Sequence, residues 1–272
     1  MGRAGEEIVK AAGKFLFLAV LGLFLAAPLV VVTGVSFNGT QRMSFPPQNP
    51  SLIWYDAFFG DPAWVSALAL SLIVASLAAL ASVSIAFPIA YAIWKYRSPT
   101  ALFLESIARI SFLLPSIVLS IVYLVFWSSI GHVGRIEDTI LSHAVVFVAL
   151  PLATIGLGFR SVDLSLVEAA RTMGAREGDV LRTVVRPIVL PYVLSGLVFV
   201  FILSLNEYII AYMVAGFEIE TLPIKVFNNL RMGFQPTMCV GAVLFMLLGV
   251  FAFSMVALIG DLPKLLGGGN RQ

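Results

Sequence analysis

The chain has 272 residues, of which 60% are apolar and only 12% are charged, and its formal net charge is +2. This composition lies outside the range of soluble globular proteins and indicates a protein built largely from membrane-spanning segments. The small positive charge gives no support for nucleic-acid binding. The single cysteine, Cys239, excludes a disulfide within the chain and a cysteine-based metal site.

Six apolar segments are long enough to cross a bilayer, which requires about 20 apolar residues. They are 14–36, 64–94, 103–130, 139–159, 191–216 and 237–261. The first segment follows basic residues, as a signal peptide does, but it is too long and lacks a clear cleavage site, so we expect an uncleaved anchor. The sequence therefore predicts an all-α, polytopic integral membrane protein with six transmembrane helices.

Lysine and arginine are distributed unevenly between the loops, and cytoplasmic loops are the ones enriched in them. If the N-terminus is inside, twelve basic residues fall on the cytoplasmic side and four on the outer side. The twelve are Arg3, Lys10, Lys14, Lys95, Arg97, Arg160, Arg171, Arg176, Arg182, Arg186, Lys264 and Arg271, and the four are Arg42, Arg135, Lys225 and Arg231. We predict that both termini and the loop at 160–190 are cytoplasmic.

Between the first two spans, residues 37–63 contain four prolines, which prevents a continuous helix. We expect a loop with one short interfacial helix around Ser51–Phe59. We divide the chain into 1–63 (cytoplasmic tail, first span and outer loop), a five-helix core at 64–262, and a cytoplasmic tail at 263–272.

Prolines also occur inside the predicted spans, at Pro88, Pro115 and Pro151. Each one frees a carbonyl group and bends its helix. The bends either serve packing or act as hinges.

The sequence offers no catalytic or metal constellation. His132 and His143 are the only histidines, and we interpret both as interfacial polar residues around an outer turn. No phosphate-binding Walker A sequence occurs, because Gly267-Gly268-Gly269 lacks the Lys-Ser/Thr that must follow. We therefore expect no enzyme activity, no metal and no cofactor in this chain.

One long polar segment separates the fourth and fifth spans. It reads Glu168-Ala169-Ala170-Arg171-Thr172-Met173-Gly174, then nine residues, then Val184-Val185-Arg186-Pro187-Ile188-Val189-Leu190-Pro191. Ser165-x-x-Glu168 has the form of a helix-capping box, and Gly174 supplies a left-handed helix end. A second short helix is expected from about Glu177 to Val185, stopping at Pro187, and Leu166 and Met173 are expected to pack within this helix pair.

This pattern resembles the E-A-A-x3-G-x9-I-x-L-P loop of the permease subunits of bacterial ABC importers, with Val184 and Arg186 departing from it. The resemblance implies that the loop fits a cleft of an ATPase subunit, which binds ATP and Mg. The residues that it assigns to coupling are Glu168, Ala169, Ala170, Gly174, Pro187 and Pro191. It also implies two ATPase subunits, a second permease subunit, an external solute-binding protein, and a place in the bacterial cytoplasmic membrane.

A charged residue inside a span is costly and usually functional. Glu207 stands near the middle of the fifth span, with Asn206, Ser204 and Tyr208 beside it. We expect Glu207 to line the substrate path, with Ser204 and Tyr208 on the same helical side. The alternative is a glutamate that binds another helix and serves packing alone.

The segment Thr221–Leu230 resembles the outer loop of polyamine-type permeases, so the chain looks most like the C-type permease subunit of spermidine/putrescine importers. Importers of opines, phosphonates, thiamine and ferric iron share much of this pattern and remain alternatives. An ion-coupled secondary transporter is a less favoured class, because no inverted repeat is evident.

Overall fold

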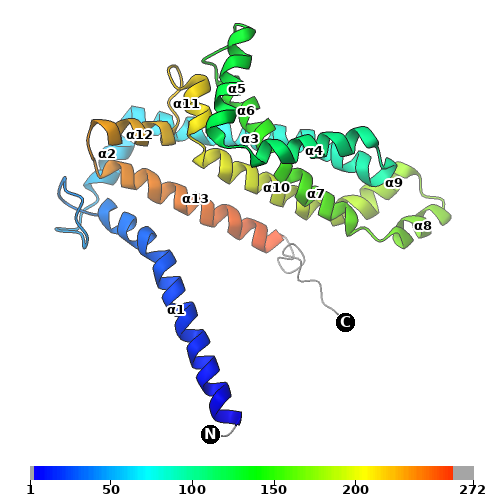
Figure 1. The fold of residues 1–272 in the computed structure, drawn as a ribbon, viewed down its shortest axis with the longest axis horizontal. Coiled ribbons are helices and arrows are strands. Elements are labelled where there is room, and N and C mark those ends of the chain that lie inside the picture. Colours follow the sequence, from blue (N-terminus) through cyan, green and yellow to red (C-terminus); the bar gives the residue numbers. More distant parts are fainter. Residues whose placement is uncertain (1–2, 260–272) are drawn as a thin grey trace. The chain divides into compact units, whose positions relative to one another are not determined.

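The computed structural model describes residues 3–259, which form helices and connecting loops without a β-strand (Figure 1). The helices are α1 Arg3–Ser36, α2 Ile53–Gly60, α3 Pro62–Tyr96, α4 Pro99–Leu113, α5 Ser116–Ser129, α6 Ile136–Val146, α7 Ala149–Arg160, α8 Leu164–Thr172, α9 Glu177–Val180, the π-helix η1 Leu181–Val185, α10 Arg186–Asn206, α11 Ile209–Ala215, α12 Leu222–Met232 and α13 Thr237–Ile259. The tail predicted at 263–272, with Lys264 and Arg271, lies outside the described residues.

Four helices are long and apolar enough to cross a membrane by themselves, and two bent helix pairs can supply two more spans. The four are Ala11–Ser36, Pro62–Tyr96, Glu177–Asn206 and Thr237–Met255. The bent pairs are α4 with α5, and α6 with α7. Six spans result if each bent pair crosses once, which agrees with the number expected from the sequence.

The third and fourth spans are bent, and the prolines inside them predict a bend in each. α4 and α5 meet at 115°, because Pro115 forces the preceding Leu114 into an extended conformation (φ −76°, ψ 144°). α6 and α7 meet at 48°, and Pro151 lies in the first turn of α7. Pro88, by contrast, lies inside the uninterrupted helix α3.

The chain divides into two compact units, each of which is described by itself: Met1–Val65 with Asn228–Met246, and Ser66–Phe227 with Leu247–Gln272. In the first unit the loop after α1 folds around the buried Asn38. The Asn38 amide donates to the Arg42 carbonyl at 2.7 Å, and its carbonyl oxygen accepts from the Gln48 N–H at 3.0 Å. The short helix that follows, α2, confirms the helix expected around residues 51–59.

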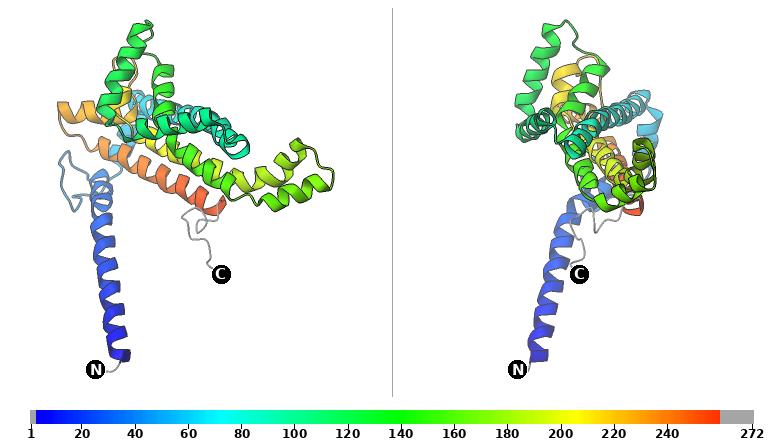
Figure 2. Two further views of the ribbon diagram at one scale, coloured as in Figure 1. Left: turned by 45° about the vertical axis from the view of Figure 1, so that its right-hand side comes forward. Right: turned by 90° about the vertical axis from the view of Figure 1, so that its right-hand side faces the viewer.

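The second unit is built on the packing of α7 against α10, which run alongside each other (Figures 1 and 2). Glycine permits this close approach. A Cβ added at Gly196 of α10 would lie 2.9 Å from the Pro151 Cα and 2.7 Å from the Thr154 Oγ1, both on α7. The core beside this contact includes Ile155, Phe159 and Val189, and it continues into the segment between the fourth and fifth spans.

We predict that Gly196→Ala destabilises the protein, because the new methyl group meets backbone atoms that cannot move cheaply. Overpacking of this kind costs about 1–3 kcal/mol. The matched control is Gly156→Ala, where an added Cβ meets nothing within 4 Å. Thermal unfolding in detergent should show a lower midpoint for Gly196→Ala and an unchanged or higher one for Gly156→Ala. Equal midpoints for the two variants would contradict the tight α7–α10 contact.

Candidate functional site

The predicted fifth span is broken at Glu207. α10 ends at Asn206, Glu207 is extended (φ −74°, ψ 124°), and α11 begins at Ile209. The expectation of one helical segment over 191–216 is therefore wrong at this point. No proline or glycine stands at the break, so its cause must lie in a side chain.

That side chain is Glu207 itself, whose carboxylate caps the N-terminus of α11. Its Oε1 accepts hydrogen bonds from the N–H groups of Ile209 and Ile210, both at 3.0 Å. Its Oε2 accepts from Ile210 at 3.0 Å and from Ala211 at 3.1 Å. The first N–H groups of any helix lack partners within the helix, and a carboxylate also interacts favourably with the positive end of the helix dipole.

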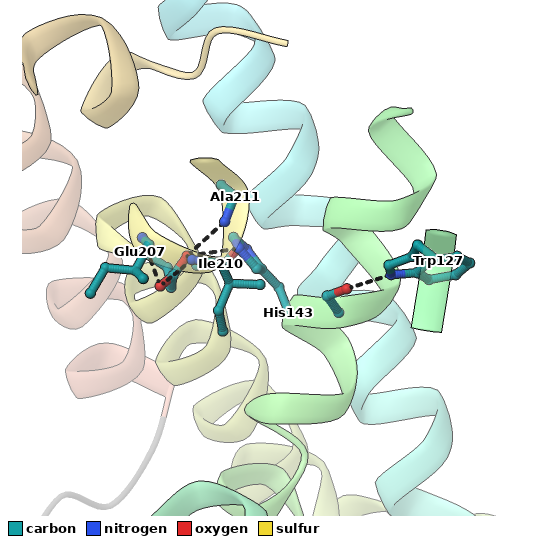
Figure 3. A network of polar contacts seen from close by, with 8 residues as sticks. Trp127, His143, Glu207, Ile210 and Ala211 are labelled. Carbon is teal, nitrogen blue, oxygen red and sulfur yellow. Dashed lines mark hydrogen bonds and ion pairs between the residues drawn. The ribbon is translucent and has the colours of Figure 1, made fainter. Parts of the chain in front are cut away.

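His143 of α6 completes a buried polar network with Glu207 (Figure 3). Its ring is 1% exposed, and its Nδ1 forms a 2.7 Å hydrogen bond with the Ser204 hydroxyl. Its Nε2 lies 3.2 Å from the Glu207 Oε2, a close polar contact that is not aligned as a hydrogen bond. The interpretation of His143 as an interfacial residue is therefore wrong, because the ring lies between α6 and the break in the fifth span.

The four residues expected to line a substrate path occupy different environments. The Glu207 side chain is 7% exposed and Ser204 is buried, so in this conformation both serve the internal network. Asn206 is exposed, and its amide donates to the Ile202 carbonyl at 2.8 Å. Tyr208 stacks on Tyr212 instead of sharing a side with Ser204, because the helix ends between them.

The segment between the fourth and fifth spans begins with a helix, α8, that is capped differently from the prediction. Asp163 is the N-cap residue, and its carboxylate accepts from the Ser165 N–H at 2.8 Å. This hydrogen bond holds the pKa of Asp163 below its usual value. Ser165 lies inside the helix, so the expected Ser165–Glu168 capping box is wrong. Gly174 has φ +86°, which confirms the left-handed corner.

Burial within this segment also differs from the prediction. Val167 and Ala170 pack into the core of the second unit, whereas Leu166 is 50% exposed and Met173 is 82% exposed. Leu166 and Met173 were expected to pack within the helix pair, and the helical register places Val167 and Ala170 there instead. Glu168 and Ala169 are exposed beside them.

The second helix of the segment does not stop at Pro187. Helix α9, the π-helix and α10 run on as one apolar helical stretch, Glu177–Asn206. Pro187 stands in the first turn of α10, where a missing N–H is tolerated, and Pro191 lies inside the helix. The expected separate helix therefore leads directly into the fifth span.

One carboxylate joins three elements at this end of the second unit. The Glu177 carboxylate of α9 accepts a hydrogen bond from the Nζ of Lys95, which lies at the end of α3; the two atoms are 2.7 Å apart. It also accepts one from the guanidinium of Arg171 on α8, at 2.5 Å. Isolated exposed ion pairs contribute little to stability, but a shared network fixes geometry better than a single pair. The two halves of the polar segment are thus connected to each other and to α3.

Comparison with known proteins identifies the family of this chain. Residues 82–261 match the sequence profile of the binding-protein-dependent transport system inner membrane component. The chain belongs to this family. It is therefore a membrane permease subunit of an ABC importer and carries no enzyme activity of its own.

Several relatives in Escherichia coli K12 are similar to this permease. The spermidine/putrescine transport system permease protein PotC is 26% identical over 220 residues, covering 81% of this chain and 83% of PotC. The putrescine transport system permease protein PotI is 29% identical over 251 residues, covering 87% and 88%. The molybdenum transport system permease protein ModB is 32% identical over 161 residues, covering 54% and 70%.

Solved structures share the permease fold. One from a bacterial ABC transporter that imports alginate covers 94% of this chain and 98% of its own, with 17% identity and a TM-score of 0.68. One from the MetNI methionine ABC transporter covers 72% and 96%, with 17% identity and a TM-score of 0.59. These likenesses agree with the all-α, polytopic fold expected from the sequence.

Each of the two predicted sites has partners that the sequence did not reveal. Glu207 contacts His143, and the polar segment contains the carboxylate of Glu177, which pairs with Lys95 of α3. His132, the other histidine, contacts Asp138 at 2.5 Å outside both sites. Among the described residues, no group of three or more metal-binding side chains gathers at either place.

We predict that Glu207→Gln lowers the thermal stability of the permease. An amide keeps one acceptor oxygen but directs its own NH₂ group at N–H donors, and a lost partner for a buried group costs about 1–3 kcal/mol. The control is Glu218→Gln, since Glu218 is exposed on the following loop. The measurement is the unfolding midpoint of the purified complex, together with solute uptake. Unchanged stability with lost uptake would contradict the capping role and favour a role in the solute path.

Proposed function

We propose that this permease imports a small organic cation of the polyamine class, spermidine or putrescine. The observation that carries the proposal is the extent of similarity: PotC and PotI match 81% and 87% of this chain, whereas ModB matches 54%. Another solute carried by the same class of importer, such as an opine, a phosphonate, thiamine or ferric iron, is the alternative. The excess of acidic over basic residues in the predicted outer segments supports a cation.

An importer permease works with an ATPase and with a solute-binding protein, and one structure of similar fold is an alginate transporter in complex with its periplasmic protein. We propose the full assembly as two ATPase subunits, this chain, and a second permease subunit that is a paralogue. ATP and Mg belong to the ATPase subunits in this assembly, so the chain itself needs no cofactor.

The polar segment Glu168–Pro191, together with the start of α8, is proposed as the surface that contacts the ATPase. Its outer face presents Leu166, Ala169 and Met173 in exposed positions beside the exposed Glu168. Its inner face, with Val167 and Ala170, is part of the permease core. An exposed apolar surface on a polar segment is typical of a contact with a partner protein.

The proposed coupling residues Glu168, Ala169, Ala170 and Gly174 all lie on α8 or at its end, while Pro187 lies in the first turn of α10 and Pro191 lies inside it. A force applied to α8 therefore passes to α10 through the Gly174 corner and the Glu177 network. The location of both termini in the cytoplasm follows from the same proposal and from the distribution of basic residues. A reporter fused after Gln272 that reads out on the outer side would contradict it.

We predict that Gly174→Val uncouples ATP hydrolysis from transport while leaving the membrane helices folded. A β-branched residue is strained at φ +86°, so the corner between α8 and α9 must change shape. The matched control is Gly178→Val, four residues on, where an added Cβ also meets open space but no positive φ is required. In proteoliposomes containing the whole importer, uptake per ATP should fall at least about fivefold for Gly174→Val only. Wild-type coupling in Gly174→Val would show that this corner is not involved.

The solute is tested by uptake into proteoliposomes that contain the whole importer, its binding protein and internal ATP. Radiolabelled putrescine and spermidine should accumulate, and each should compete with the other. Molybdate and thiamine in excess should leave that uptake unchanged. Accumulation of either of these compounds, with none of a polyamine, would replace the proposed solute class.

A further inference from the structure

A groove of about 540 Å³ lies in the second unit, where α3 and α7 meet the continuous stretch of α9, η1 and α10. Three of the side chains that line it, Phe159, Val185 and Val189, are almost fully buried. Phe87 and Leu190 also line it and are about 40% exposed, at 42% and 41%. The volume falls within the range of pockets that hold small organic ligands, about 300–1,000 Å³.

The polarity of the groove changes along its length. Phe87, Phe159 and Val193 lie within three different apolar runs that the sequence marks as spans. Arg182 and Arg186 line the same groove but precede the apolar run at 191–216. From Arg186 to Val193 the helix rises roughly 10 Å, at about 1.5 Å per residue. This is less than the roughly 15 Å of hydrocarbon in one leaflet, so the apolar part of the groove lies at acyl-chain depth and the arginines lie near the headgroups.

The two arginines of the groove are available to an anion. Both are exposed, and no described carboxylate forms an ion pair with Arg182 or Arg186. The acidic residues that precede them in the chain have other partners. Glu177 belongs to the ion-pair network of α3, α8 and α9, and the Asp179 carboxylate accepts a hydrogen bond from the Arg176 N–H at 3.2 Å. The guanidinium group is planar and binds phosphate through pairs of N–H donors.

The wall of the groove includes the π-helix. Leu181, Arg182 and Val185 all belong to η1 and all line the groove. π-Helical turns are rare and occur frequently at functional sites. A ligand in this groove would therefore contact the segment that joins α9 to the fifth span.

We propose that the groove binds one anionic phospholipid of the surrounding membrane, with a phosphate headgroup such as that of phosphatidylglycerol. The phosphate accepts hydrogen bonds from Arg182 and Arg186, and an acyl chain lies against Phe87, Phe159 and the apolar side of α10. Basic pockets between membrane helices bind anionic lipid headgroups in this way. The proposal does not depend on which solute the importer carries.

Charge and depth favour a lipid over a protein as the occupant. A cytoplasmic ATPase cannot reach the apolar part of the groove, because that part lies within the spans. The face proposed for the ATPase is a different one, since Leu166, Ala169 and Met173 of α8 do not line the groove. A second permease subunit would have to bring a carboxylate to the arginines, whereas lipid phosphate is already present at that depth.

The test is native mass spectrometry of the whole importer, purified in detergent and titrated with phosphatidylglycerol or with phosphatidylcholine. Arg182→Gln combined with Arg186→Gln removes both charges of the groove. The matched control combines Arg97→Gln with Arg160→Gln, two exposed arginines that do not line the groove. The mass of each intact complex shows whether all subunits have assembled.

A second pair of variants tests the apolar part without changing any charge. Leu190→Trp places a larger side chain in the groove. Leu203→Trp is its control, because Leu203 lies on the same helix, is 36% exposed and does not line the groove. A simple attraction between surface arginines and anionic lipid would not respond to Leu190→Trp.

The wild-type complex should bind phosphatidylglycerol at least about tenfold more tightly than phosphatidylcholine. The Arg182/Arg186 double variant should lose about tenfold in phosphatidylglycerol affinity, and Leu190→Trp about fivefold. Both controls should stay within about twofold of the wild type. Inorganic phosphate at the concentration of the lipid should not displace it.

Wild-type phosphatidylglycerol affinity in either groove variant would overturn the proposal. An equal loss in the Arg97/Arg160 control would show a diffuse effect of charge and would overturn it as well. Displacement by inorganic phosphate would indicate a site for a free anion instead of a lipid. Loss of an ATPase or permease subunit from the Arg182/Arg186 variant would assign the groove to a protein contact.

Discussion

Hydrogen bonds to one carboxylate allow a membrane helix to stop and restart within a few residues. In hydrocarbon there is no water to replace the bonds that a broken helix loses, so each free N–H group needs a partner from the protein. Glu207 supplies that partner for three successive residues of α11. His143 of α6 contacts the same carboxylate and forms a hydrogen bond with Ser204 of α10, so three helices meet at the break. The negative charge of the buried carboxylate interacts with the positive end of the α11 dipole. The path of the chain from α10 into α11 depends on this arrangement.

How much of this could be read from the sequence depends on which force decides each feature. Hydropathy predicts the apolar segments, and Pro115 predicts a bend, because a proline disfavours the helical backbone conformation of the residue before it. The break at Glu207 could not be read in the same way. No proline or glycine stands at the break, and its free N–H groups are capped by the Glu207 carboxylate, which also contacts the distant His143. A signal for His143 was present nonetheless: a polar ring in an apolar span needs a polar partner, and Glu207 is a charged residue near the middle of another span.

In the polar segment, the residue type alone predicts the left-handed turn at Gly174, but it does not predict which residues of α8 face the core. Gly174 is required where φ is positive, and that requirement is visible in one residue. Which apolar residues face the core is decided by packing: Val167 and Ala170 are buried, while Leu166 and Met173 are not. Pro187 looked like a helix end, but a proline in the first turn of a helix is equally compatible with a beginning.

The continuity of the helical stretch from Glu177 to Asn206 has a mechanical consequence. Thirty residues at 1.5 Å each make a lever of roughly 45 Å. Its near end is held through Glu177 by Lys95 and Arg171, and its far end stops at Glu207, which caps α11. If the stretch moves as a rigid rod, a tilt of roughly 10° about one end displaces the other by about 8 Å. A modest rotation at the Glu177 end would then be enough to displace the break at Glu207, without any local melting of the helix that carries the motion.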